Sequence, residues 1–110
     1  MVLAEQAYRV TARFPKDEVY GMTSQIRRAA TSIAANIAEG HGRENSGSFI
    51  QFLRMSQGSL KELETHLLLA ERVKLVRMEE VEPLLKRCDE LGKMTRSLIR
   101  SIQRRQSDGG

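Results

Sequence analysis

Residues 22–37, Met-Thr-Ser-Gln-Ile-Arg-Arg-Ala-Ala-Thr-Ser-Ile-Ala-Ala-Asn-Ile, form the stretch that decides the fold. Its larger apolar side chains recur every three or four residues, which places them on one face of an α-helix. They are Met22, Ile26, Ala29, Ile33 and Ile37. The sustained alternation of apolar and polar residues that indicates a half-buried strand is absent from the chain. The sequence therefore predicts an all-α protein.

Breaks in the helical pattern on both sides of this stretch divide the chain into four segments. They fall at Phe14–Asp17, at Gly40–Asn45 and at Lys74–Arg77. We expect helices over about residues 2–13, 18–39, 46–73 and 78–106, with a flexible tail at 107–110. The connections are short, which favours antiparallel neighbours. The predicted fold is an antiparallel up-down four-helix bundle in one domain over residues 1–110.

Two local motifs refine the ends of these helices. Ser48 and Gln51 have the spacing of a capping box at the start of the third helix. Gly40 or Gly42 follows the second helix and is expected to close it in a left-handed conformation. Both motifs predict sharp helix boundaries around the loop between the two helices.

Composition restricts the compartment in which we expect the protein. The chain has one cysteine, Cys88, so it cannot form an internal disulfide, and the thiol is expected to be a small buried hydrophobe. The first residues lack a basic stretch followed by an apolar one, and no segment approaches the roughly 20 apolar residues that span a bilayer. These observations favour a cytoplasmic protein with no membrane partner.

The second and third predicted helices carry more small and apolar surface than one bundle needs. Small residues lie opposite the apolar stripe of the second helix, and Phe52, Met55, Ser59 and Leu69 lie outside the stripe of the third. Tight packing inside the bundle is one interpretation. We favour a contact between subunits of a homo-oligomer. The residues expected there are Thr31, Ala34, Ala35, Ala38, Phe52, Met55 and Leu69.

Basic residues form rows on the third and fourth predicted helices. Parallel basic rows can follow a phosphate backbone, and the formal net charge of +4 favours acidic partners. The alternative is a charged face that only keeps the bundle soluble. No aromatic residue lies within the rows, so contacts to RNA backbone and shape are expected rather than base stacking. The candidate nucleic-acid-binding residues are Arg54, Lys61, Arg72, Lys93, Arg96, Arg100 and Arg104.

The sequence offers no convincing catalytic, metal or cofactor site. His41 and His66 lie on different segments and lack a second cysteine or a suitably spaced pair of carboxylates. No nucleophile, base and orienting group occur together. We therefore expect a non-enzymatic protein without a cofactor.

Four blocks of sequence resemble a known family. They are residues 14–30, which begin Phe-Pro-Lys-Asp-Glu, residues 32–40, Ser-Ile-Ala-Ala-Asn-Ile-Ala-Glu-Gly, and residues 49–53 and 58–65. With these blocks the chain closely resembles the bacterial four-helix-bundle proteins encoded in 23S rRNA intervening sequences. Members usually begin with a tryptophan-containing stretch ahead of the segment that matches Ala4–Tyr8, whereas this chain has no tryptophan. Two alternatives follow: the start of the sequence is truncated, or the first helix is short by nature.

The resemblance also carries functional expectations. It implies a homopentameric ring of bundles that binds structured RNA, such as rRNA. The family is similar in fold to the accessory protein of diversity-generating retroelements, which implies an alternative role as a scaffold for a protein partner. Either role is non-enzymatic.

Overall fold

Among the residues that the structure describes, four antiparallel α-helices form the body of the protein. The structure is a computed structural model that describes residues 2–108. The helices are α1 (Val2–Thr11), α2 (Ser24–His41), α3 (Ser46–Arg72) and α4 (Met78–Asp108), with the short helical turns η1 (Lys16–Glu18) and η2 (Val19–Thr23) between α1 and α2. The described chain contains no strand, so the predicted all-α class and antiparallel four-helix bundle are confirmed.

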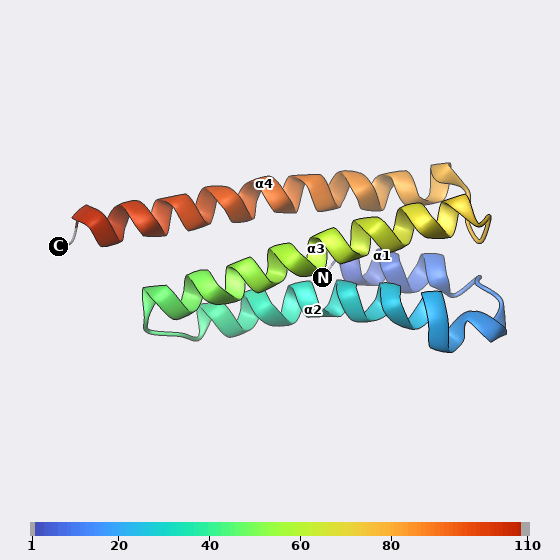
Figure 1. Ribbon diagram of the computed structural model, residues 1–110, viewed down its shortest axis with the longest axis horizontal. Coiled ribbons are helices and arrows are strands. Elements are labelled where there is room, and N and C mark those ends of the chain that lie inside the picture. The colour runs from blue at the N-terminus through green and yellow to red at the C-terminus, as the bar shows by residue number, and fades with distance from the viewer. Residues whose placement is uncertain (1, 109–110) are drawn as a thin grey trace.

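The helices differ in how much of the bundle they span. Figure 1 shows α2, α3 and α4 running along its long axis, whereas α1 lies beside only one half and begins near the middle. The principal-axis extents are 54 × 22 × 18 Å. One half of the bundle therefore has four helices in cross-section and the other half has three.

The predicted apolar stripes form the core. Ile26 and Ile33 of α2 are fully buried, as are Leu63 and Leu67 of α3. The main cluster also contains Leu3, Ala7, Leu84 and Cys88 from α1 and α4. A smaller cluster lies in the three-helix half and consists of Ile50, Leu53, Ile99 and Ile102. The core is thus divided unequally along the bundle.

Several predicted helix boundaries differ from the structure. The first helix ends at Thr11 and not at 13, the second ends at His41 and not at 39, and the third ends at Arg72 and not at 73. The second helix does not begin at residue 18, because Lys16–Thr23 forms η1 and η2, and Gly21 has the non-helical angles φ −104° and ψ −111°. The last helix does not end at 106. It continues through Asp108, since residues 93–108 contain neither proline nor glycine. Residues 107–108 are therefore helical, and the rest of the predicted tail lies outside the described residues.

The predicted capping motifs are also wrong. Asn45 is the N-cap of α3, and its side-chain oxygen accepts a hydrogen bond of 3.0 Å from the amide of Ser48. Gly42 ends α2 with φ −77° and ψ −5°, so it is not left-handed. A left-handed residue follows α3 instead, where Lys74 has φ 65°. The Asn45 side chain satisfies the amide of Ser48, so the N-terminal cap of α3 lies three residues before the predicted one.

Gly40 has a packing role instead of a capping role. A Cβ atom at this position would lie 2.9 Å from Cδ1 of Phe49 and 3.2 Å from Cβ of Phe52. Gly58, in the middle of α3, has open space around the same position. The absent side chain at residue 40 therefore lets the ends of α2 and α3 approach closely.

We predict opposite effects of alanine at these two glycines. Gly40→Ala should lower the free energy of unfolding by about 1–3 kcal/mol because of overpacking against Phe49. Gly58→Ala should raise it by about 0.5–1 kcal/mol because alanine is the better helix former. Urea unfolding followed by circular dichroism measures both changes. Equal stabilisation by the two substitutions would contradict the close approach at Gly40.

Candidate nucleic-acid and subunit interfaces

Basic side chains from α3 and α4 meet along the outer groove between these helices. Arg54, Arg96 and Arg100 line one hollow, together with Gln57 and Ile99. Arg96 and Lys61 line the neighbouring hollow. Antiparallel packing thus joins four of the predicted nucleic-acid-binding residues into one surface, the basic cluster, defined as Arg54, Lys61, Arg96 and Arg100.

The position of Arg96 depends on a glycine one turn earlier in α4. A Cβ atom at Gly92 would lie 3.3 Å from Nη1 of Arg96. Gly92 itself is buried, so the guanidinium group lies over a part of the helix that has no side chain. This arrangement keeps Arg96 between the two hollows.

The electrostatic surroundings of the basic cluster vary along its length. Within residues 2–108, none of its four cations forms an ion pair with a carboxylate. Glu64 and Asp89 line the hollow at the Lys61 end, and Asp89 pairs with Lys93 at 3.1 Å. The positive character is therefore strongest around Arg54, Arg96 and Arg100.

The other three predicted nucleic-acid-binding residues lie elsewhere. Arg72 ends α3 beside the start of α4, where the first turn carries Glu79 and Glu80. Lys93 pairs with Asp89 and lines a different groove, between α4 and α2. Arg104 is exposed near the end of α4, and it lines neither hollow of the basic cluster. The sequence placed all seven residues in rows, but helix packing brings only four together.

Sequence reasoning missed a second site with basic and aromatic side chains. Tyr8, Tyr20, Arg27 and Arg28 line one hollow. The guanidinium carbon of Arg27 lies 4.4 Å from the centroid of the Tyr8 ring, while the Tyr20 side chain is 97% exposed. Arg27 also donates a 2.8 Å hydrogen bond to Thr11, which ties it to α1. No spacing within one helix signals this cluster, because it forms only where α1 packs against α2.

The small-residue face of α2 lies on the outside of the bundle. Thr31, Ala35 and Ala38 are exposed and Ala34 is half-buried. Packing inside this bundle, the alternative interpretation of the face, is therefore wrong for the three exposed residues. An uncharged strip of helix remains uncovered by the rest of the described chain.

The residues of α3 that we predicted in the subunit contact do not form one continuous surface with the small-residue face. Phe52 is half-buried and Met55 is 51% exposed. Ser59 is buried, and its hydroxyl lies 2.8 Å from that of Ser32 on α2, so it belongs to the interface between the helices. Leu69 is 45% exposed but lies about 21 Å further along α3 than Met55, at roughly 1.5 Å per residue. Phe52 and Met55 therefore flank the small-residue face, whereas Leu69 belongs to the other end of the helix.

Groups with potential reactivity are dispersed. His41 contacts the ring of Phe49 at a centroid distance of 5.0 Å, and His66 lies more than halfway along α3. Among residues 2–108, no three His, Cys, Asp or Glu side chains are grouped so that they could hold a metal ion. Within the same range, no helix combines the length and apolar character required to cross a membrane.

Cys88 is held as a neutral thiol by its surroundings. Its side chain is 1% exposed on the core face of α4. Burial, and secondarily the nearby charge of Glu64, raises its pKa from 9.0 to about 12. The thiolate is the nucleophilic form, so the folded protein presents an unreactive cysteine.

We predict that alkylation of Cys88 reports unfolding. At pH 8, iodoacetamide should modify the native protein far more slowly than the urea-unfolded protein, because roughly one thiol in ten thousand is ionised at a pKa of about 12. Mass spectrometry of timed samples measures both rates. Equal rates in the two states would show that the thiol is accessible and ionisable in the fold.

The fold and these surfaces define a class of protein: a small antiparallel four-helix bundle whose polar groups lie mainly on the outer faces of its helices. The family model described as 23S rRNA-intervening sequence protein matches residues 1–97. The chain belongs to this family, which confirms the resemblance found in the sequence.

A solved structure has the same fold. It is a protein of unknown function from the S23 ribosomal protein family of Bacteroides thetaiotaomicron VPI-5482. The TM-score is 0.74 with 24% identity, and the alignment covers 88% of this chain and 97% of that chain. At this identity the similarity establishes the fold alone. No curated protein matches the chain.

Proposed function

We propose that the protein is a non-enzymatic, homo-oligomeric bundle of the cytoplasm, encoded with 23S rRNA intervening sequences, that binds structured RNA through the basic cluster. The observation that carries this proposal is the convergence of Arg54, Lys61, Arg96 and Arg100 from two helices without an ion-paired carboxylate among the described residues. Membership of the family supports RNA as the polyanion.

The geometry of the basic cluster suits recognition of phosphates. Arginine guanidinium groups bind phosphate oxygens in a forked arrangement, and each phosphate contact releases a condensed counterion. Side chains cannot read the deep major groove of double-helical RNA, so such RNA is bound mainly through its phosphates, 2′-hydroxyls and shape. The basic cluster contains no aromatic side chain, which favours this mode over base stacking. Affinity should therefore depend strongly on salt and weakly on sequence.

We predict that reversing two charges at the centre of the basic cluster weakens RNA binding. The double variant Arg96→Glu, Arg100→Glu should bind a labelled RNA hairpin at least about tenfold more weakly at low salt. The slope of log affinity against log salt concentration should fall by about two, one for each lost phosphate contact. Fluorescence anisotropy at several salt concentrations measures both quantities.

A matched control separates the basic cluster from net charge. Lys16→Glu, Lys86→Glu gives the same net charge at two exposed positions outside the basic cluster. It should retain most of the affinity and slope. Equal losses of affinity in the two double variants would show that net charge alone, and not the basic cluster, determines RNA binding. Undetectable binding of RNA by the wild type at low salt would refute the proposal.

The oligomeric part of the proposal rests on the exposed small-residue face of α2. Thr31, Ala34, Ala35 and Ala38 allow another backbone to approach, and Phe52 and Met55 add apolar area beside them. We infer that these six residues contact a second copy, and that the assembly is a homopentamer of the kind that the family resemblance implies. Leu69 would take part only through a separate contact.

We predict that Ala35→Glu shifts the assembly to smaller species without loss of helicity. Ala35 is exposed, so the substitution leaves the core of the bundle unchanged but introduces a charge into the proposed contact. Light scattering coupled to size exclusion measures the mass, and circular dichroism measures helicity. Ala12→Glu is the control, because Ala12 is an exposed alanine beyond the end of α1. A monomeric wild type would contradict this proposal.

A further inference from the structure

The hollow between α1, η2 and the first turns of α2 brings aromatic rings and cations together from separate segments of the chain. Its lining includes Tyr8 of α1, Tyr20 of η2, and Arg27 and Arg28 of α2. Figure 1 shows the blue turns that precede α2 at one end of the long axis. The hollow has a volume of about 390 Å³, within the roughly 300–1,000 Å³ that is typical of small-ligand sites. A single nucleotide is therefore of a suitable size.

The Tyr20 ring projects into solvent beside this hollow. Its side chain is 97% exposed, although an aromatic ring packed on the core would bury a large apolar area. Gly21 follows it with the non-helical angles φ −104° and ψ −111°, whereas Met22 and Ile26 are already directed to the core. At this exposure both faces of the Tyr20 ring are open to a stacking partner.

The two arginines of the hollow have hydrogen-bond partners but no counter-charge. Arg27 donates a 2.8 Å hydrogen bond to Thr11, and its guanidinium carbon lies 4.4 Å from the centroid of the Tyr8 ring. Arg28 donates a 3.3 Å hydrogen bond to the hydroxyl of Ser24. Among residues 2–108, neither arginine forms an ion pair with a carboxylate. Their charge is therefore available to an anion.

The acidic residues of the neighbouring turn do not line the hollow. They are Asp17 and Glu18 of η1. The carboxylate of Glu18 instead accepts a 3.4 Å hydrogen bond from the amide of Met22. The lining itself contains no aspartate or glutamate, so its charge is positive.

One polar group in the lining lacks a partner. The chain has five threonines, and four of their hydroxyls donate to the backbone carbonyl four residues earlier. The exception is Thr23, which is 5% exposed and whose hydroxyl has no hydrogen-bond partner among the described residues. A buried polar group without a partner costs free energy. A ligand acceptor that reached Thr23 would offset this cost.

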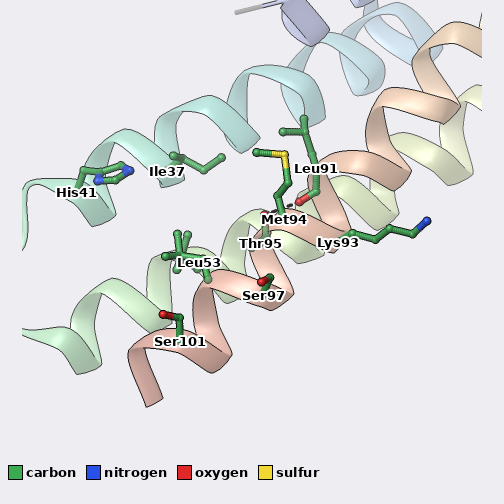
Figure 2. Close-up of a pocket in the computed structure, with 10 residues that line it drawn as sticks. Ile37, His41, Leu53, Leu91, Lys93, Met94, Thr95, Ser97 and Ser101 are labelled. Carbon is green, nitrogen blue, oxygen red and sulfur yellow. Dashed lines mark hydrogen bonds between the residues drawn. The ribbon is translucent and has the colours of Figure 1, made fainter. Parts of the chain in front are cut away.

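The larger groove between α2 and α4 lacks this combination of groups. Figure 2 shows the Met94 side chain directed from α4 toward α2, on the side where Ile37 lies. Lys93 is the one lysine or arginine in that lining, and it pairs with Asp89 at 3.1 Å. The hollow beside Tyr20 differs because two tyrosine rings and two unpaired arginines share one lining.

We propose that this hollow binds one unstacked nucleotide of an RNA single strand, with the base stacked on Tyr20 and the phosphate held by Arg27 and Arg28. Stacking on aromatic rings and charge-assisted hydrogen bonds to phosphate are the usual means of binding single strands. The choice of RNA as the nucleic acid rests on the proposed function.

A second copy of the chain is the less favourable occupant. Thr31 borders both this hollow and the small-residue face of α2. That face carries no carboxylate, so a copy packed through it would remove the guanidinium groups of Arg27 and Arg28 from water without pairing their charge. A phosphate supplies the missing charge.

This site is separate from the basic cluster. The hollow lies between α1 and α2, whereas the basic cluster lies between α3 and α4. Double-helical RNA is recognised through phosphates and shape, and unpaired bases are recognised by stacking. The protein would therefore have one surface for an RNA stem and another for an unpaired nucleotide.

Two labelled oligonucleotides test this proposal. The probe is a single strand of about six uridines, and the matched probe has the same sugar-phosphate backbone without bases. Fluorescence anisotropy with the full chain gives the ratio of the two affinities, in which the contribution of the phosphates cancels. The probe with bases should bind at least about fivefold more tightly, the gain expected from stacking on one aromatic ring.

Substitutions of Tyr20 locate the base. Tyr20→Leu keeps an apolar side chain but removes the ring, so the affinity ratio should fall close to one, whereas Tyr20→Phe should preserve it. Tyr20 is almost fully exposed, so circular dichroism should show unchanged helicity in both variants. Met94→Ala is the control, because it removes an exposed side chain from the groove of Figure 2 and should leave the ratio unchanged.

A charge substitution locates the phosphate. Arg28→Gln should weaken binding of both probes and lower the slope of log affinity against log salt concentration by about 0.7, the value for one contact to a single strand. The double variant Arg96→Glu, Arg100→Glu should leave the affinity ratio unchanged, because the basic cluster does not contact the base. Loss of hairpin binding and loss of this site are therefore distinguishable.

Three results would overturn the proposal. They are equal affinities of the wild type for the two probes, an unchanged affinity ratio in Tyr20→Leu, and a smaller assembly of Tyr20→Leu in light scattering. The last result would identify a second copy as the occupant of the hollow.

Discussion

The close packing of α2 against α3 is the constraint on which the rest of the molecule depends. The two helices meet through small and hydroxyl-bearing side chains: Ser32 and Ser59 share a hydrogen bond, and the fully buried Ser56 donates to the backbone carbonyl of Ile33. At the far end, Gly40 leaves room for Phe49. A buried hydroxyl is tolerated only where it finds a partner, so these contacts fix the register of the pair as well as its distance.

This register determines where the outer surfaces lie. With Ser32 opposite Ser59, the small side chains of α2 that do not face α3 are turned outward, beside Phe52 and Met55. On the opposite side of α3, α4 places Arg96 and Arg100 next to Arg54. The small residues of α2 and the basic cluster therefore belong to different helices, and the two surfaces come nearest along α3, where Met55 follows Arg54.

The helices and most of their buried faces were predictable from the sequence, because apolar side chains at helical spacing determine which face is buried. Ile26, Ile33, Leu63 and Leu67 are in the core as that spacing predicts. The helix ends were less predictable. Asn45 caps α3 through a side-chain hydrogen bond and Lys74 follows α3 in a left-handed backbone conformation, but other polar residues and glycines nearby indicated different caps. The grouping of charges was the least predictable. Arg72 and Lys93 follow the same periodicity as Arg54 and Arg96, and only the placement of neighbouring helices separates them. For the same reason the pairing of Tyr8 with Arg27 had no signal in the sequence.

The unequal division of the core has a further consequence for how the molecule opens. The main cluster draws on all four helices, whereas the cluster of Ile50, Leu53, Ile99 and Ile102 joins only α3 and α4. The free energy of local opening depends on the apolar area buried around each segment, so amide hydrogens at the three-helix end exchange with solvent through smaller fluctuations than those near Leu63.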